Sequence, residues 1–169
     1  MDYAKWLEER TAVRRSLKAL LPRLLPAGAR NEAWTPAQVF HHVLLANLGS
    51  WNLLERLAAK APKAPPRTAG LEWPVRPELL VFPEQTAFSV EAFSGTAPDK
   101  GVTLAELEEM ESAENEQASV LARSAESLDL SRLGFRHPLA GAMNFYEWLC
   151  FCTVHEKLHW QRLVADLKA

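Results

Sequence analysis

The chain has 169 residues, enough for one domain with a sizeable core, and its hydrophobic content of 48% and charged content of 24% are ordinary for a globular protein. A formal net charge of -2 gives no general attraction to nucleic acid or to an anionic membrane, and no apolar run is long enough to span a bilayer. The opening MDYAKWLEER lacks the apolar core of a signal peptide, so we expect a cytoplasmic location.

The first two predicted helices come from apolar residues at helical spacing. Residues 3–25 carry this pattern, and Pro26 closes the segment. The second helix opens at TPAQ, where Thr35 and Gln38 form a capping box around a proline at the first helical position, and it runs to about residue 59. On the first helix we expect the basic residues to lie opposite the apolar stripe: Arg14, Arg15, Lys18 and Arg23.

Two further helices are predicted in the second half of the chain. The third opens at TLAE, a capping box of Thr103 and Glu106, and its acidic middle, EEMESAENEQ, is typical of a solvated face. The fourth opens at NFYE, with Asn144 as the cap and Glu147 at the third position, and runs to about residue 167. Four helices with one long crossover between the second and the third predict an all-α four-helix bundle, formed as a single domain over residues 1–169.

The connections between the helices differ in length. The crossover, residues 61–102, is long for a loop, and its aromatic residues lead us to expect that it packs on the bundle. No strand pattern is strong, and only LLVFP, residues 79–83, suggests a short strand. The other connection, residues 129–143, contains GFRHPLAGAM.

The motif HEKLH, residues 155–159, raises the question of a metal site. His155 and His159 are one helical turn apart, so both imidazoles leave the same face and can chelate one metal ion. The motif also matches the H-E-x-x-H signature of zinc proteases. After His159, however, only Asp166 offers a carboxylate and no substrate-aligning strand follows, so we disfavour a protease.

The third ligand of such a site is then expected upstream, in the second helix. An open catalytic metal site needs at least three protein ligands. The adjacent His41 and His42 point about 100° apart, so only one of them faces the core. If Val39, Ala46 and Leu53 face inward, His42 shares their stripe, and His41 is expected at the surface or behind the ligands.

These motifs together resemble the DinB-like (YfiT-like) family of metalloenzymes. WTPAQVFHHV is similar to the first histidine signature of that family, in which the metal ligand follows the tryptophan by eight residues. Counted from Trp34, that position is His42. HPLAGAMNFYEWLCF resembles the approach to the last helix, and HEKLH resembles the closing H-x-x-x-H. The resemblance spans most of the chain and implies an up-down-down-up four-helix bundle with a metal triad of His42, His155 and His159.

The resemblance also implies a chemistry. Zinc or nickel suits three imidazole ligands. The metal either lowers the pKa of bound water, as in a hydrolase, or stabilises a thiolate. Relatives include bacillithiol S-transferases and a mycothiol-dependent maleylpyruvate isomerase. The resemblance therefore favours a metal-dependent S-transferase that acts on a low-molecular-weight thiol and an electrophile. It also implies that the protein is a homodimer. A hydrolase, or a non-catalytic bundle that acts through dimerisation or partner binding, remains an alternative.

Other notable side chains have ordinary interpretations. Glu156 could be the general base of the H-E-x-x-H motif, but we favour a position at the helix surface, because long charged side chains are mostly exposed. Cys152 lies on the same face of the fourth helix as His155 and His159, where it is expected to be a small buried hydrophobic residue or a fourth metal ligand. We expect Cys152 and Cys150 to be reduced thiols. His137 is expected to be structural or exposed. Candidates for binding a thiol's carboxylates or for lining a pocket are Arg76, Arg136, Trp51, Trp73 and Phe82.

Overall fold

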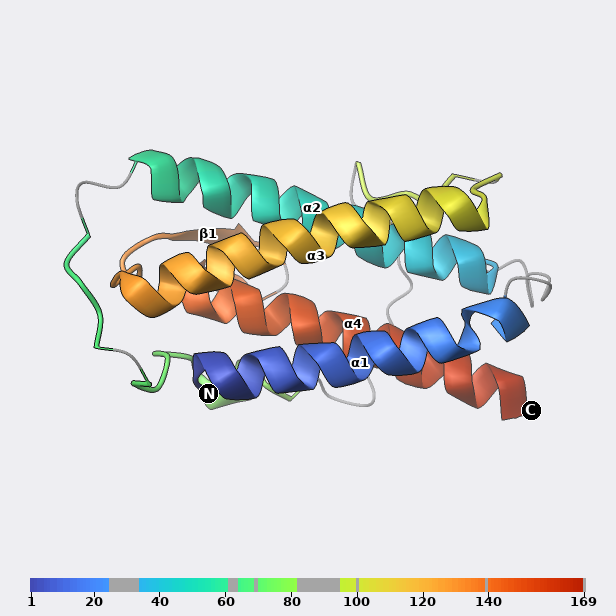
Figure 1. Ribbon diagram of the computed structural model, residues 1–169, viewed down its shortest axis with the longest axis horizontal. Helices are drawn as coiled ribbons and strands as arrows, with labels where there is room; N and C mark the ends of the chain where they lie inside the picture. Colours follow the sequence, from blue (N-terminus) through green and yellow to red (C-terminus); the bar gives the residue numbers. More distant parts are fainter. Residues whose placement is uncertain are drawn as a thin grey trace.

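A computed structural model of the protein describes residues 1–24, 34–60, 64–68, 70–81, 95–99, 101–138 and 140–168. Its main elements are the four helices α1 (Tyr3–Leu24), α2 (Pro36–Lys60), α3 (Leu104–Ser127) and α4 (Phe145–Lys168). Helices α1 and α4 run in one direction and α2 and α3 in the other (Figure 1). The protein is a four-helix bundle, as the sequence predicts.

Three capping boxes set where helices begin. Gln38 N–H donates to the hydroxyl of Thr35 at 3.2 Å, while Thr35 N–H donates to the side chain of Gln38 at 2.9 Å. Thr103 and Glu106 form the same pair of bonds before α3. At the start of α4, Asn144 and Glu147 exchange two bonds of 2.9 Å. All three predicted boxes are therefore confirmed.

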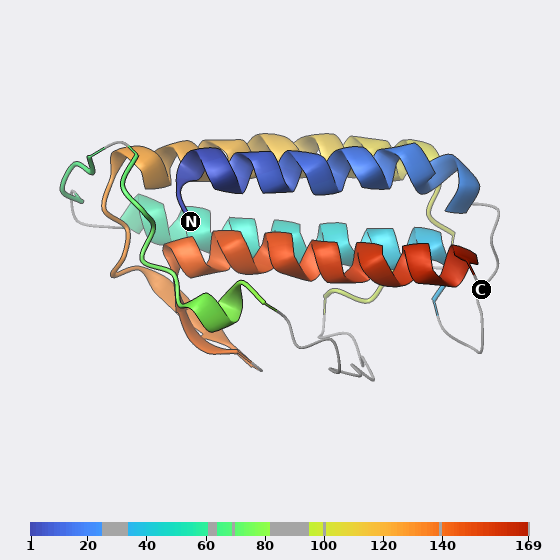
Figure 2. The same ribbon diagram turned by 90° about the horizontal axis from the view of Figure 1, so that it is seen from below.

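A small hairpin modifies the all-α expectation. Strands β1 (Gly134–His137) and β2 (Gly141–Asn144) pair antiparallel and lie beside the first turns of α4 (Figure 2). The ring of Phe135 stacks on Trp148 of α4 at 3.9 Å, and the Trp148 indole N–H donates to the Phe135 carbonyl at 3.1 Å. The hairpin depends on these contacts, so the local sequence pattern did not reveal it.

The start of the crossover packs on the bundle, as expected. Trp73 is buried between Trp6 of α1 and Tyr146 of α4, with ring centroids 5.9 and 5.5 Å away. The expected strand at residues 79–83 is wrong in its described part, because Leu79 ends the 3-10 helix η1 (Pro77–Leu79) and a bend follows. Phe82, Phe88 and Phe93 lie outside the described residues.

The buried stripe of α2 differs from the expected one. Leu53 is 46% exposed, whereas Trp51 and Leu54 are fully buried. The stripe passes through Asn47, whose amide is also fully buried. A stripe traced through apolar residues alone misses this polar position, and the predicted inward orientation of Leu53 is wrong.

No described helix combines the length and apolar character required to cross a membrane.

Candidate metal centre

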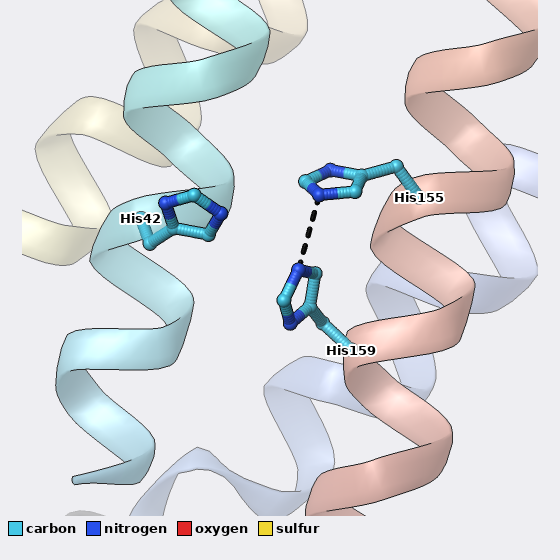
Figure 3. A group of neighbouring side chains, drawn as sticks. All are labelled: His42, His155 and His159. Carbon is cyan, nitrogen blue, oxygen red and sulfur yellow. Dashed lines mark hydrogen bonds between the residues drawn. The ribbon is translucent and has the colours of Figure 1, made fainter. Parts of the chain in front are cut away.

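Three histidine side chains converge between α2 and α4. His42 projects from α2, and His155 and His159 project from successive turns of α4 toward it (Figure 3). One ligand nitrogen from each residue can be chosen so that all three lie within 4.8 Å of one another. The Nε2 atoms of His155 and His159 are 3.0 Å apart. The structure thus brings together the three residues that the sequence selects as metal ligands.

One hydrogen bond determines the tautomer of His42. Its Nδ1–H donates to the backbone carbonyl of Thr96 in the crossover at 2.8 Å. This bond fixes the neutral tautomer with the lone pair on Nε2. The Nε2 atom is buried and has no hydrogen-bond partner. A buried nitrogen lone pair without a partner is costly, and a metal ion would satisfy it.

The electrostatics keep the imidazoles neutral. Burial lowers the pKa of His42, with the Thr96 bond opposing the shift. Burial also lowers the pKa of His155 well below its usual value, with His159 and His42 adding to the effect. The pKa of His159 falls to about 3, through burial and then the neighbouring His42. Neutral imidazole is the form that binds a metal.

The donor set fits a divalent metal such as zinc or nickel. A tetrahedral ion with zinc–nitrogen bonds of about 2.05 Å places its ligand nitrogens about 3.3 Å apart. The observed separations of 3.0 Å and up to 4.8 Å approach this spacing. Two of the three histidines lie beside aromatic rings: the ring centroid of Trp34 is 4.9 Å from that of His42, and Phe151 lies parallel to His155 at 6.2 Å. Of the three, His155 is half-buried and His42 is buried.

The glutamate of the HEKLH motif points away from the three histidines. Glu156 is only 1% exposed, so the predicted surface position is wrong. Its carboxylate forms ion pairs with Arg14, through a close contact to Nε, and with Arg10 at 3.7 Å. Burial raises the pKa of Glu156, and the two arginines only partly offset this effect. Glu156 is committed to a structural network and has no place as the base of a zinc protease.

That network joins all four helices. Glu114 of α3 accepts from Arg10, from Arg14 at 2.8 Å, and from the Trp51 indole N–H at 2.6 Å. Asn47 of α2 donates to Glu114 at 3.1 Å and to Glu156 at 3.4 Å. We refer to Arg10, Arg14, Asn47, Glu114 and Glu156 as the buried ionic network. Its two arginines and two glutamates balance in charge, which is how such groups tolerate burial.

The network corrects two further predictions. Arg14 was expected opposite the apolar stripe, yet it is buried, as is Arg10. Likewise Glu111 and Glu114 are buried within an acidic stretch predicted to be solvated, although Glu108, Glu109 and Glu116 are exposed. The sequence did contain a signal: the two arginines occupy the same helical stripe as Trp6, Val13 and Leu17, all of which are buried.

The remaining candidates lie outside the triad. Cys152 is a buried free thiol whose pKa burial raises to about 12, and it is not grouped with the metal ligands. His137 lies in β1, where its Nδ1 accepts from Ala140 N–H at 3.0 Å, so it is structural. His41 is buried, which rules out the surface and leaves the other predicted position, behind the ligands; its Nδ1 accepts from the Asp99 N–H at 3.1 Å.

The proposed carboxylate and pocket residues have other roles. Arg76 pairs with Glu147, 2.6 Å from Nε to Oε1, and anchors the crossover to α4. Arg136 is exposed on the hairpin. Trp51 and Trp73 are core residues rather than the lining of a pocket. Phe82 lies outside the described residues.

Comparisons with known proteins support the fold. No family model matches the chain, and no curated protein sequence matches it. The crystal structure of TT2238, a four-helix bundle protein, is similar, with a TM-score of 0.62 and 23% sequence identity over 96% of this chain and 98% of that chain. At this level of identity the likeness establishes a helical-bundle fold and says nothing of function.

Proposed function

We propose that the protein is a metal-dependent S-transferase in which His42, His155 and His159 hold zinc or nickel. The observation that carries this proposal is the convergence of three neutral imidazoles, one of them with a buried, unpartnered Nε2. The resemblance of the sequence to DinB-like metalloenzymes adds the chemistry, namely transfer of a low-molecular-weight thiol to an electrophile. Two buried, free cysteines are consistent with a cytoplasmic protein.

The residues of this chain position the reaction. The bound metal would supply a positive charge that favours the thiolate form of a thiol. His42 is oriented by the Thr96 carbonyl and packs on Trp34, and we propose that substrates approach the metal beside the half-buried His155. In the transfer, sulfur forms a bond to an electrophilic carbon, the leaving group departs with the bonding electron pair, and the thiol proton passes to solvent.

Among the described residues, Arg162 is a cation placed to favour an anionic thiol. It lies three residues after His159 and seven after His155, on the same face of α4, and helical side chains lean toward the N-terminus. Its charge contributes to the lowered pKa of both histidines. Arg162 already makes an interaction within the chain, but a guanidinium has five N–H donors and serves several partners. It replaces Arg76 and Arg136 as the candidate for a thiol's carboxylate.

The test is thiol transfer by metal-loaded protein. Purified untagged protein, loaded with zinc or nickel, would be assayed with monobromobimane and either mercaptoethanol or mercaptosuccinate. We expect faster conjugation with the wild type than with His42→Ala. We also expect the wild type to prefer mercaptosuccinate, the dicarboxylate thiol, and Arg162→Gln to reduce this preference. Lys157→Gln, which removes an exposed charge on the same helix, should leave the preference unchanged. Metal-loaded protein that accelerates no conjugation, and instead hydrolyses esters or amides, would contradict the transferase and favour the hydrolase.

A further inference from the structure

The two adjacent histidines of α2 both bond to one short segment of the crossover. His42 donates through Nδ1 to the carbonyl of Thr96 at 2.8 Å, and His41 accepts through Nδ1 from the N–H of Asp99 at 3.1 Å. Nδ1 is therefore a hydrogen-bond donor in His42 and an acceptor in His41, so His42 carries a proton on Nδ1 and His41 does not. Four residues, 96–99, are thus fastened to α2 at both ends.

The 96–99 segment is suited to act as a short rigid link. Its sequence is TAPD, and Pro98 restricts the backbone between the two bonded residues. Gly95 precedes it with φ 91°, a conformation that favours glycine. His41 itself is 4% exposed and borders a cavity of about 430 Å³ that Asp99, Glu106 and Glu109 also line. A buried histidine that accepts from a loop N–H holds that loop against the helix.

We propose that His41 is a positioning residue for the metal centre, acting on His42 through the 96–99 segment. The Asp99 bond to His41 fixes one end of the segment, and this keeps the Thr96 carbonyl at the other end on Nδ1 of His42. A carbonyl bonded to the outer nitrogen of a metal-binding histidine fixes its tautomer and ring orientation, and losing such a partner typically costs about 10- to 100-fold in metal affinity. The inference rests on the proposed function, because it requires His42 to bind a metal.

Coupling between the segment and the metal must act in both directions. If the segment strengthens metal binding at His42, then metal binding must stabilise the segment by the same free energy. The Asp99 amide should therefore exchange its hydrogen more slowly in the zinc-bound protein than in the metal-free protein. This consequence separates a positioning role for His41 from a contribution to folding alone, which would affect both forms alike.

The experiment compares two substitutions of similar bulk. His41→Leu removes the acceptor, whereas His41→Asn keeps an acceptor oxygen close to the position of Nδ1. Glu109→Ala, an exposed side chain beside the same cavity, serves as the control. Zinc affinity would be measured by competition with a chromophoric chelator, Asp99 amide exchange by NMR with and without zinc, and the stability of the metal-free forms by urea unfolding.

We expect zinc affinity to fall by about tenfold or more in His41→Leu and to stay within about threefold of the wild type in His41→Asn and Glu109→Ala. Zinc should slow exchange at Asp99 in the wild type and not in His41→Leu. Three results would overturn the inference while leaving the proposed function standing. They are wild-type zinc affinity in His41→Leu, equal losses of zinc affinity in His41→Leu and His41→Asn, or hydrogen exchange at the Asp99 amide that zinc does not slow in the wild type. A wild-type protein that bound neither zinc nor nickel would overturn the proposed function and the inference together.

Discussion

Glu156 shows how one side chain can belong to a catalytic motif and yet serve the core. It follows His155 directly, but the helix turns its carboxylate toward Arg14 and Arg10 rather than toward the imidazoles. The histidines and the glutamate therefore divide between two places in the bundle, the candidate metal centre and the buried ionic network. The H-E-x-x-H pattern is a consequence of helical spacing here and does not indicate a protease.

Replacing Glu156 tests this division of roles. In Glu156→Gln the two arginines lose one buried counter-charge, and breaking a buried ion pair typically costs about 3 kcal/mol. We expect a lower free energy of unfolding by urea, with zinc content and thiol-transfer rate per bound zinc near those of the wild type. Loss of transfer at unchanged stability would identify Glu156 as part of the chemistry instead.

At the scale of elements, the buried ionic network holds the four helices in register. Burial disfavours the charged form of Glu114, but Arg10, Arg14 and the Trp51 indole outweigh it and lower the pKa of the carboxyl. Because α1, α2, α3 and α4 each contribute a member, the network fixes their relative positions. His42 on α2 meets His155 and His159 on α4 only if those two helices keep this register.

The network gives the bundle a predictable response to acid. Because the pKa of Glu114 is lower in the folded state than the unfolded value of about 4.3, its stabilisation is present above that pH and is lost as pH falls through the folded-state pKa. Glu114→Gln should be less stable than the wild type by about 3 kcal/mol at neutral pH. The difference should shrink below about pH 4.3, measured by urea unfolding of both metal-free proteins. A constant difference across that range would contradict the ionised state of Glu114.

Local signals predicted the elements well, and long-range contacts explain what they missed. The helix starts at residues 36, 104 and 145 follow from capping boxes, whose bonds lie within four residues. The hairpin of β1 and β2 depends on Trp148, and the burial of Arg10 and Glu114 depends on partners about a hundred residues apart. Charged residues are usually exposed, so sequence reasoning placed the acidic stretch that contains Glu114 on a solvated face and made no prediction for Arg10.

The same distinction applies to the candidate site. The spacing of His155 and His159 was enough to pair them as candidate metal ligands. His42 could be selected as the third ligand from its position in the second helix together with the family resemblance. The Thr96 carbonyl could not be predicted, because a backbone group in a long crossover leaves no pattern in the sequence. The inward orientation of Leu53, used in selecting His42, is wrong, although His42 is buried and faces the other two histidines.

For the whole molecule, a metal in the triad would act as a clamp between the two halves of the chain. Its ligands come from α2 and α4, more than a hundred residues apart, and an ion that binds only the folded protein stabilises it. Free zinc at a hundred times the dissociation constant should raise the free energy of unfolding by about 2.7 kcal/mol. Zinc should give no such gain in His42→Ala, and an equal gain in both proteins would place the metal elsewhere.

Metal content is the most direct measurement, determined by elemental mass spectrometry on untagged protein reconstituted with zinc or nickel and then freed of excess metal. A metal centre built by α2 and α4 should give about one equivalent in the wild type and lose that metal in both His42→Ala and His159→Ala, since one ligand comes from α2 and the other from α4. Wild-type protein that retains neither metal, or single variants that keep a full equivalent, would contradict a metal centre shared by the two helices.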